Sequence, residues 1–156
     1  MRLTKRTTYA IRILMYCAAN DERLSHVPTI ASVFGVSKLF LFHILRPLTQ
    51  AGLIETIRGR NGGIRLARAA KSISLLDVVT RTEDGFSMGE CRVDNHGTGS
   101  CPLTDQCVFH EALSAALGSF FDVLRGHSIQ DLISARATVR QLLGINEISA
   151  ARALQL

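Results

Sequence analysis

The sequence lacks any apolar run long enough to cross a bilayer. Its longest unbroken apolar stretch, from Ile13 to Ala19, has seven residues, whereas a transmembrane helix needs about 18 or more. The basic start is followed by this short run, but no small-residue cleavage pattern of a signal peptide comes after it. We therefore expect a cytoplasmic protein that has no membrane as a partner.

The sequence also lacks the high charge and low hydrophobic content of a disordered chain. Charged residues make up only 20% of the sequence and hydrophobic residues 47%, which is typical of a folded protein. A chain of 156 residues can bury a core. Its length favours one domain with at most one small appendage.

Acidic residues are scarce in the first part of the chain. Residues 1–70 hold eleven Lys or Arg against three Asp or Glu, a net charge of +8, whereas the remaining 86 residues hold seven against ten, a net charge of −3. A compact basic segment is expected of a protein that neutralises phosphates. A merely solvated basic face is the alternative that composition leaves open.

The basic segment has the element order of a helix-turn-helix. A helix with Pro28 near its start is followed by the tight turn of residues 35–37, and Ser37 is a good N-cap for a helix from Lys38 to about Ala51. Before them, a first amphipathic helix that ends near Asn20 is predicted by residues at helical spacing. Its apolar stripe comprises Leu3, Thr7, Ala10, Leu14 and Cys17.

The helix that starts at Lys38 is the predicted recognition helix. Four residues that recur every third position predict its buried face, namely Leu39, Phe42, Leu45 and Leu48. Either Phe40 or Leu41 then meets the DNA, where a thymine methyl group would suit it. Pro47 predicts a kink or a late break. The candidate DNA contacts of this helix are Ser37, Lys38, Phe40, His43 and Arg46, and the basic start of the chain adds Arg2 and Lys5.

A β-hairpin is predicted directly after this helix. Residues 54–58 and 64–66 alternate like strands, and the turn-rich residues 59–63 separate them. Arginine suits a narrow minor groove or phosphates, and glycine lets the backbone approach closely. The candidate contacts of this wing are Arg58, Arg60, Asn61 and Gly62. Since its glycines fit no phosphate-loop motif, we predict a winged helix-turn-helix for residues 1–70.

Three of the four cysteines lie in or beside one glycine-containing loop. They are Cys91, Cys101 and Cys107, and His110 follows three residues after the last. An odd cluster in a cytoplasmic chain argues against disulfides, and the thiols predict an iron-sulfur cluster. Structural zinc is the main alternative, although closely spaced cysteine pairs are absent, and a metal-free redox switch stays open. Cys17 is predicted to be a core thiol.

The second part of the chain is predicted to be helical around this loop. Ser74 caps a short helix, and a long apolar stripe runs up to Arg125; its members are Phe109, Leu113, Ala116, Leu117, Phe120 and Leu124. Such a stripe suggests a partner helix from a second subunit, and a homodimer would suit a palindromic operator. Packing against the chain's own core is the alternative. Residues 128–132 predict a final helix.

Together the motifs divide the chain into a winged helix-turn-helix (1–70), a cluster loop with a dimerisation helix (71–145) and a tail (146–156). In this order they resemble the bacterial iron-sulfur winged-helix regulators of the IscR, NsrR and RirA type. The resemblance rests on the start of the chain, the turn at 35–37, the wing at 58–66 and the cysteine loop. Segments such as 39–42 and 101–103 are most similar to the iron-responsive RirA branch.

The resemblance implies a homodimeric repressor that binds double-stranded promoter DNA with its cluster intact and releases it when the cluster is lost. Thr8 stands where NsrR-like members can place an Asp ligand, whereas Cys107 and His110 are similar to a ligand pair of IscR. These features leave the cluster type open, with [4Fe-4S] preferred and [2Fe-2S] as the alternative. The three cysteines are the expected ligands and His110 is the candidate fourth, with a position open to solvent or a small molecule as the alternative. Iron status is the expected signal, and nitric oxide or redox state is the second choice.

An enzyme is not expected. Catalysis would need Cys107 as nucleophile and His110 as base, and the sequence offers neither an orienting acid nor an oxyanion site for such a pair.

Overall fold

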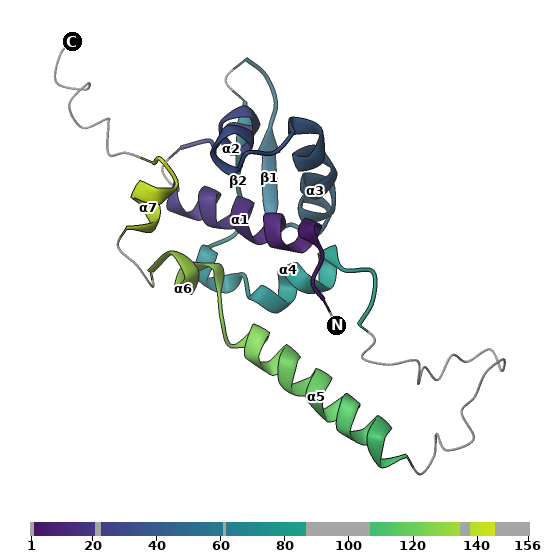
Figure 1. Cartoon of the computed structure of the whole chain (residues 1–156). Helices are drawn as coiled ribbons and strands as arrows, with labels where there is room; N and C mark the ends of the chain where they lie inside the picture. The colour runs from purple at the N-terminus through teal and green to yellow at the C-terminus, as the bar shows by residue number, and fades with distance from the viewer. Residues whose placement is uncertain (1, 21–22, 61, 87–106, 135–137, 146–156) are drawn as a thin grey trace.

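The fold is mainly helical with one small antiparallel hairpin in the described part of the chain (Figure 1). The computed structural model describes residues 2–20, 23–60, 62–86, 107–134 and 138–145. The elements are α1 (Lys5–Ala19), α2 (Val27–Phe34), α3 (Lys38–Gln50), β1 (Ile54–Ile57), β2 (Gly63–Leu66), a short 3₁₀ turn η1 (Ala70–Ser72), α4 (Leu75–Thr82), α5 (Val108–Arg125), α6 (Ile129–Ser134) and α7 (Val139–Leu142). The predicted order of helix-turn-helix, hairpin and long helix is confirmed.

Helix α1 forms the centre of the core. The hydroxyl of Thr4 accepts a hydrogen bond from the N–H of Thr7 and thereby caps the helix, and the N–H of Asn20 closes its far end on the carbonyl of Tyr16. The hairpin and α3 pack on one side of α1, and α4 and α6 pack on the other (Figure 1). The predicted stripe is buried from Thr7 onward, and Leu3 precedes the helix.

Helices α2 and α3 are joined as the turn chemistry predicts. Pro28 lies in the first turn of α2, and Gly35 ends the helix with a left-handed φ of 62°. Ser37 then caps α3 by accepting the N–H of Phe40 at 3.2 Å. The two helices meet at 116°, within the range of a helix-turn-helix. Helix α3 continues past Pro47 to Gln50, because the missing N–H falls in its last turn.

Strand β2 of the hairpin is bound to the connection between α1 and α2 near its turn end. Ser25 exchanges two backbone hydrogen bonds with Ile64 of β2, both 2.8 Å long, and the side-chain amide of Asn20 donates to the Ser25 hydroxyl at 3.0 Å. A Cβ on Gly63 would lie 2.9 Å from the Ser25 carbonyl oxygen. Glycine is therefore needed for this close approach, which fixes the hairpin relative to α1.

Helix α5 extends from this body, and the chain returns afterwards (Figure 1). Ser74 and Asp77 form a capping box at the start of α4, which confirms the predicted capped helix. After α5 the chain is fixed to the body again at Ile129, which is fully buried. Its N–H donates a hydrogen bond to the carbonyl of Ile73 at 2.9 Å. The sequence predicts α6 as the final helix, but the four-residue α7 follows it.

Helix α7 was missed because so short a segment has no helical period to detect. It is held by one buried side chain just beyond its end, that of Leu143. The predicted tail, residues 146–156, lies outside the described residues. Within the described ranges, no single helix is long and apolar enough to cross a membrane, although α2 and α3 together meet that length and composition as a bent pair.

Candidate functional site

The predicted buried face of α3 is half wrong. Leu45 and Leu48 are buried, but Leu39 is 68% exposed and Phe42 is 56% exposed. A step of three residues turns back by about 60° around a helix, so four residues at such steps drift over about 180°. The buried face consists instead of residues spaced by three and four: Leu41, Ile44, Leu45 and Leu48.

Phe40 does not point freely outward, as a direct contact with DNA would require. Its ring lies edge-on against Tyr9 of α1, with 5.4 Å between ring centroids, and Tyr9 also meets Phe34 at 6.4 Å. The guanidinium of Arg12 covers the Tyr9 ring at 4.9 Å. This aromatic cluster sets the position of α2 and α3 on α1, so the structure gives Phe40 a packing role.

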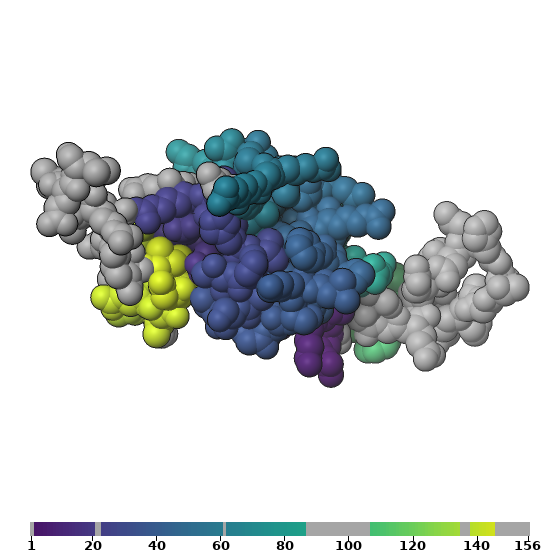
Figure 2. Space-filling model, turned by 90° about the horizontal axis from the view of Figure 1, so that it is seen from above, coloured from purple at the N-terminus to yellow at the C-terminus, as the bar shows by residue number. Residues whose placement is uncertain are grey.

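The polar candidates of α3 all lie on its solvent side. Ser37, Lys38, His43 and Arg46 are exposed, and so are Arg2, which precedes α1, and Lys5, its first residue. Figure 2 shows α2, α3 and the hairpin together on one face of the molecule, with α5 almost hidden behind them. The elements that carry Lys38, Arg46 and Arg58 therefore share one face, which is open to a large partner.

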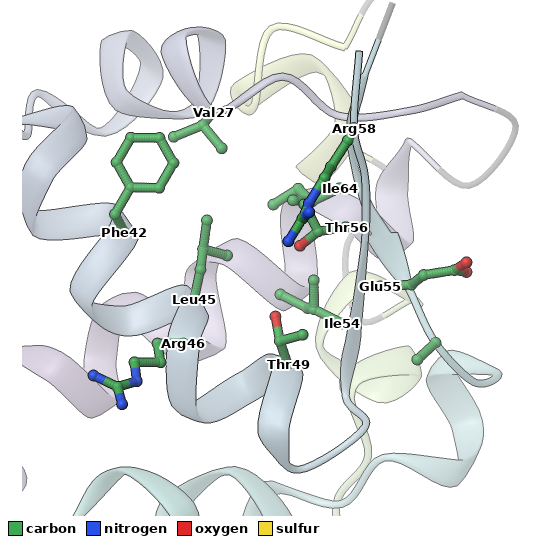
Figure 3. A pocket seen from close by; sticks show the side chains of 11 residues that line it. Val27, Phe42, Leu45, Arg46, Thr49, Ile54, Glu55, Thr56, Arg58 and Ile64 are labelled. Carbon is green, nitrogen blue, oxygen red and sulfur yellow. The ribbon is translucent and has the colours of Figure 1, made fainter.

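A groove of about 760 Å³ separates α3 from the hairpin. Because side chains alternate along a strand, Ile54, Thr56 and Arg58 face α3, where Phe42 and Arg46 form the opposite wall (Figure 3). Its floor is apolar, and its rim carries the two guanidinium groups. The sequence predicted both walls, but not the groove between them, because that depends on how the hairpin packs.

The tip of the hairpin is shaped by its glycines. Gly59 has a φ of 111°, and a Cβ on Gly62 would lie 2.3 Å from the carbonyl oxygen of Ile57. Gly62 is thus required by the turn itself, whether or not DNA approaches it. Arg58 and Arg60 are exposed on this tip, and Asn61 lies outside the described residues.

The face of the hairpin that points away from α3 carries an ion pair. Arg65 donates to Glu55 across the two strands at 2.9 Å, and Figure 3 shows the Glu55 side chain directed away from α3. Glu55 is the only carboxylate of the two strands, and it is paired with Arg65 and directed away from Arg58. This leaves the groove side of the hairpin positive.

A polar cluster that the sequence did not predict joins the start of α1 to the end of α4. The Glu83 carboxylate accepts the Thr4 N–H at 2.8 Å and the Thr4 hydroxyl at 3.0 Å, and it also accepts the hydroxyl of Thr7. Arg6 donates to the Thr82 carbonyl at 2.6 Å and pairs with Asp84 at 2.9 Å. These partners lie more than 70 residues apart, so no local sequence signal could reveal them.

Burial raises the pKa of Glu83, but the hydrogen bonds from Thr7 and Thr4 and the charge of Arg6 outweigh this effect. The pKa of Glu83 therefore lies below its ordinary value of 4.5. The carboxylate is charged at neutral pH, which strengthens the hydrogen bonds it accepts. Glu83 thus binds the first turn of α1 to the chain that leads towards residue 87.

Of the four candidate cluster ligands, the structure describes two. Cys107 is the N-cap of α5 and His110 lies in its first turn, both half-buried, whereas Cys91 and Cys101 lie outside the described residues. Among the residues described, no group of three or more metal-ligating side chains comes together. Cys107 and His110 are one turn apart and open to an outside group, and thiolate and imidazole both bind iron, so this part of the donor set fits a cluster.

Cys17, unlike Cys107, is inaccessible to a metal. It is 3% exposed in the core, and burial raises the pKa of its thiol to about 12 in spite of a hydrogen bond with Ser25. A thiol held neutral in this way is a poor metal ligand. The prediction that Cys17 is a core residue is confirmed.

The apolar stripe of α5 has little cover from its own chain. None of the 18 residues of this helix, all of them described, is buried. Phe109 is 63% exposed, and Leu113, Leu117, Phe120 and Leu124 are half-buried. Phe121 is held against Phe86 near α4, with 4.9 Å between ring centroids.

Comparison with known proteins gives consistent results. The profile of the family Rrf2, described as "Iron-dependent Transcriptional regulator", matches residues 3–135. Protein aau3 of Rhizobium meliloti (strain 1021) is 58% identical over 147 residues, which are 94% of each chain. The HTH-type transcriptional regulator NsrR of Geobacillus kaustophilus (strain HTA426) is 42% identical over 144 residues, 92% of this chain and 97% of the relative.

A solved structure has the same fold. That of CymR, the global cysteine regulator of B. subtilis, matches with a TM-score of 0.68 at 23% identity and covers 87% of this chain and 98% of its own. It supports the architecture of a winged helix-turn-helix followed by a long helix.

Proposed function

The chain belongs to the Rrf2 family of transcriptional regulators, and we propose that it is a cytoplasmic repressor that binds promoter DNA and reports iron status through an iron-sulfur cluster. The observation that carries the proposal is the shared orientation of α3 and the hairpin. Arg46 and Arg58 line one groove in the half of the chain with a net charge of +8. A polyanion is the partner that this face fits.

The DNA contacts divide by their chemistry. Helix α3 enters the major groove with Ser37, Lys38, His43 and Arg46, as in other helix-turn-helix proteins. In this proposal, the minor groove or phosphates are contacted by Arg58, Arg60, Asn61 and Gly62, and further phosphate contacts come from Arg2 and Lys5. Phe40 supports this surface from within.

The cluster is held by Cys91, Cys101 and Cys107, with His110 as the fourth ligand, and [4Fe-4S] is the preferred type. When bound, it supplies a centre that iron shortage or oxidation can remove. The part of the chain described here contributes an accessible thiol at the N-cap of α5 and an imidazole in the same turn. Imidazole ligation is sensitive to protons and labile, which suits a site meant to lose its cluster.

The functional unit is a homodimer formed through α5. Its stripe of half-buried Leu and Phe residues, with no buried residue along the described helix, is covered by the same helix of a second copy. Two-fold symmetry would match the two halves of a palindromic operator.

The test is anaerobic purification of the full chain followed by visible absorption and DNA binding. We expect a brown protein whose absorption is lost in Cys107→Ala and whose DNA affinity falls after chelation of iron. Cys17→Ala is the matched control, because it removes a thiol from the core, and it should keep the chromophore. A colourless wild-type protein that contains zinc would contradict the cluster.

His110 is tested by the rate of cluster loss. His110→Ala should retain iron but lose it faster to a chelator or show a shifted spectrum. Identical spectra and identical rates would remove His110 from the ligand set and leave three cysteines with another fourth ligand.

A further inference from the structure

Two large apolar side chains stand on the solvent face of the recognition helix. Leu39 and Phe42 are more than half exposed, although the folded core has buried residues on the other side of α3, from Leu41 to Leu48. Neighbouring exposed apolar groups that are rimmed by polar residues are typical of a binding surface, whereas single ones are common on any protein. Neither side chain belongs to the buried core cluster.

Their helical positions place them on one stripe with the basic residues. Residues 39, 42, 43 and 46 follow the spacing of one helix face, and all four are exposed. Phe42 also forms the wall of the groove opposite Arg58 (Figure 3). A partner that meets this stripe therefore offers negative charge and apolar groups at the same time.

Major-groove DNA meets this description. Phosphates pair with the arginines, and among the bases only thymine presents an apolar group there, its C5-methyl. Leu39 and Phe42 are about 4.5 Å apart along the helix axis, close to the 3.4 Å between successive bases of a strand. An acidic protein partner would match the charge, but it would leave the hairpin groove without an occupant.

We infer that Leu39 and Phe42 are specificity-determining residues that contact thymine methyl groups in the operator. The inference rests on the proposed DNA-binding function and adds to it the chemical feature that α3 recognises. Lys38 and Arg46 then hold the helix against the flanking phosphates, and the two apolar side chains select the sequence. Apolar contact offers no hydrogen bond to guanine or adenine, so thymine is preferred at these steps.

The experiment uses the full anaerobically purified chain and a pool of random DNA duplexes. Duplexes enriched by the protein are synthesised twice, with thymine or with uracil, which lacks only the methyl group. We expect the wild type to lose about fourfold in affinity for each contacted methyl group, from about 0.8 kcal/mol per buried carbon. Phe42→Ala and Leu39→Ala should bind both duplexes with more equal affinity.

The matched control is Leu142→Ala, because Leu142 is 77% exposed on α7, outside the helix-turn-helix. This variant should discriminate between the duplexes as the wild type does. Equal affinity of the wild type for both duplexes would overturn the inference while leaving sequence-specific binding intact, and so would unchanged discrimination in both α3 variants. If no duplex is enriched at all, the proposed function fails, and this inference fails with it.

Discussion

Helices α1 and α5 look alike in sequence and differ completely in the fold. Each has an apolar stripe, and they contain 15 and 18 residues. Eight residues of α1 are buried, whereas none of the described residues of α5 is. An amphipathic pattern thus predicts that a helix will be covered on one face, but it does not say whether the cover comes from the same chain.

The largest expected difference between the two helices is in stability. Leu14→Ala in α1 removes a fully buried side chain and should lower the free energy of unfolding by about 2–5 kcal/mol. Val123→Ala in α5, where the side chain is 61% exposed, should change it by less than about 0.5 kcal/mol. Urea unfolding followed by circular dichroism measures both, and equal losses would show that α5 belongs to the same core.

The next effect concerns assembly. Leu117→Asp places a charge in the α5 stripe and should raise the dissociation constant of the dimer at least about 100-fold, because a central apolar contact of an interface is lost. Light scattering or sedimentation measures the change. Ser119→Asp adds the same charge on the opposite side of the helix and should leave the dimer intact. A Leu117→Asp variant that stays dimeric but unfolds more easily would place the stripe against its own chain.

A smaller difference, in DNA affinity, is expected between arginine substitutions on the two faces of the hairpin. Arg58→Ala should weaken DNA binding by about 1–3 kcal/mol and reduce its dependence on salt. Arg65→Ala removes the same charge from the same hairpin, but Arg65 pairs with Glu55 on the face away from α3, so it should cost much less. Fluorescence anisotropy at fixed salt compares them, and equal losses would mean that the groove does not orient the DNA.

Much of the first region could be predicted because its signals are local. The Ser37 cap, the Gly35 turn and the alternation of β1 and β2 act within a few residues, and the structure confirms each of them. The face of α3 was assigned incorrectly because steps of three follow the helical period for only a short distance. That error hid Leu39 and Phe42 as exposed residues.

Contacts between distant parts of the chain could not be predicted. The groove needs the hairpin to fold back towards α3, and the Glu83 cluster joins residues that lie far apart in sequence. Charge composition indicated which part of the chain is positive, but not which arginines face the same groove. The cysteine spacing suggested a metal centre, and the assignment of its ligands stays a prediction.

The smallest predicted effect concerns the Glu83 cluster, where the start of α1 meets the chain that leads away from the core (Figure 1). Because the pKa of Glu83 is lowered in the folded state, its charge contributes stability that is present above the ordinary pKa of 4.5 and is lost as the pH falls through the folded value. Glu83→Gln keeps an oxygen that can accept from Thr4, but it removes the charge, so it should cost about 1 kcal/mol at pH 7. At a pH below the pKa of Glu83 in the folded state, the variant and the wild type should be nearly equally stable.

Asp84→Asn is the control, because the Asp84 side chain is 94% exposed and its ion pair with Arg6 should contribute little. Urea unfolding at both pH values decides the matter: a Glu83→Gln deficit that stays constant with pH would mean that shape, and not charge, joins the two regions at this point.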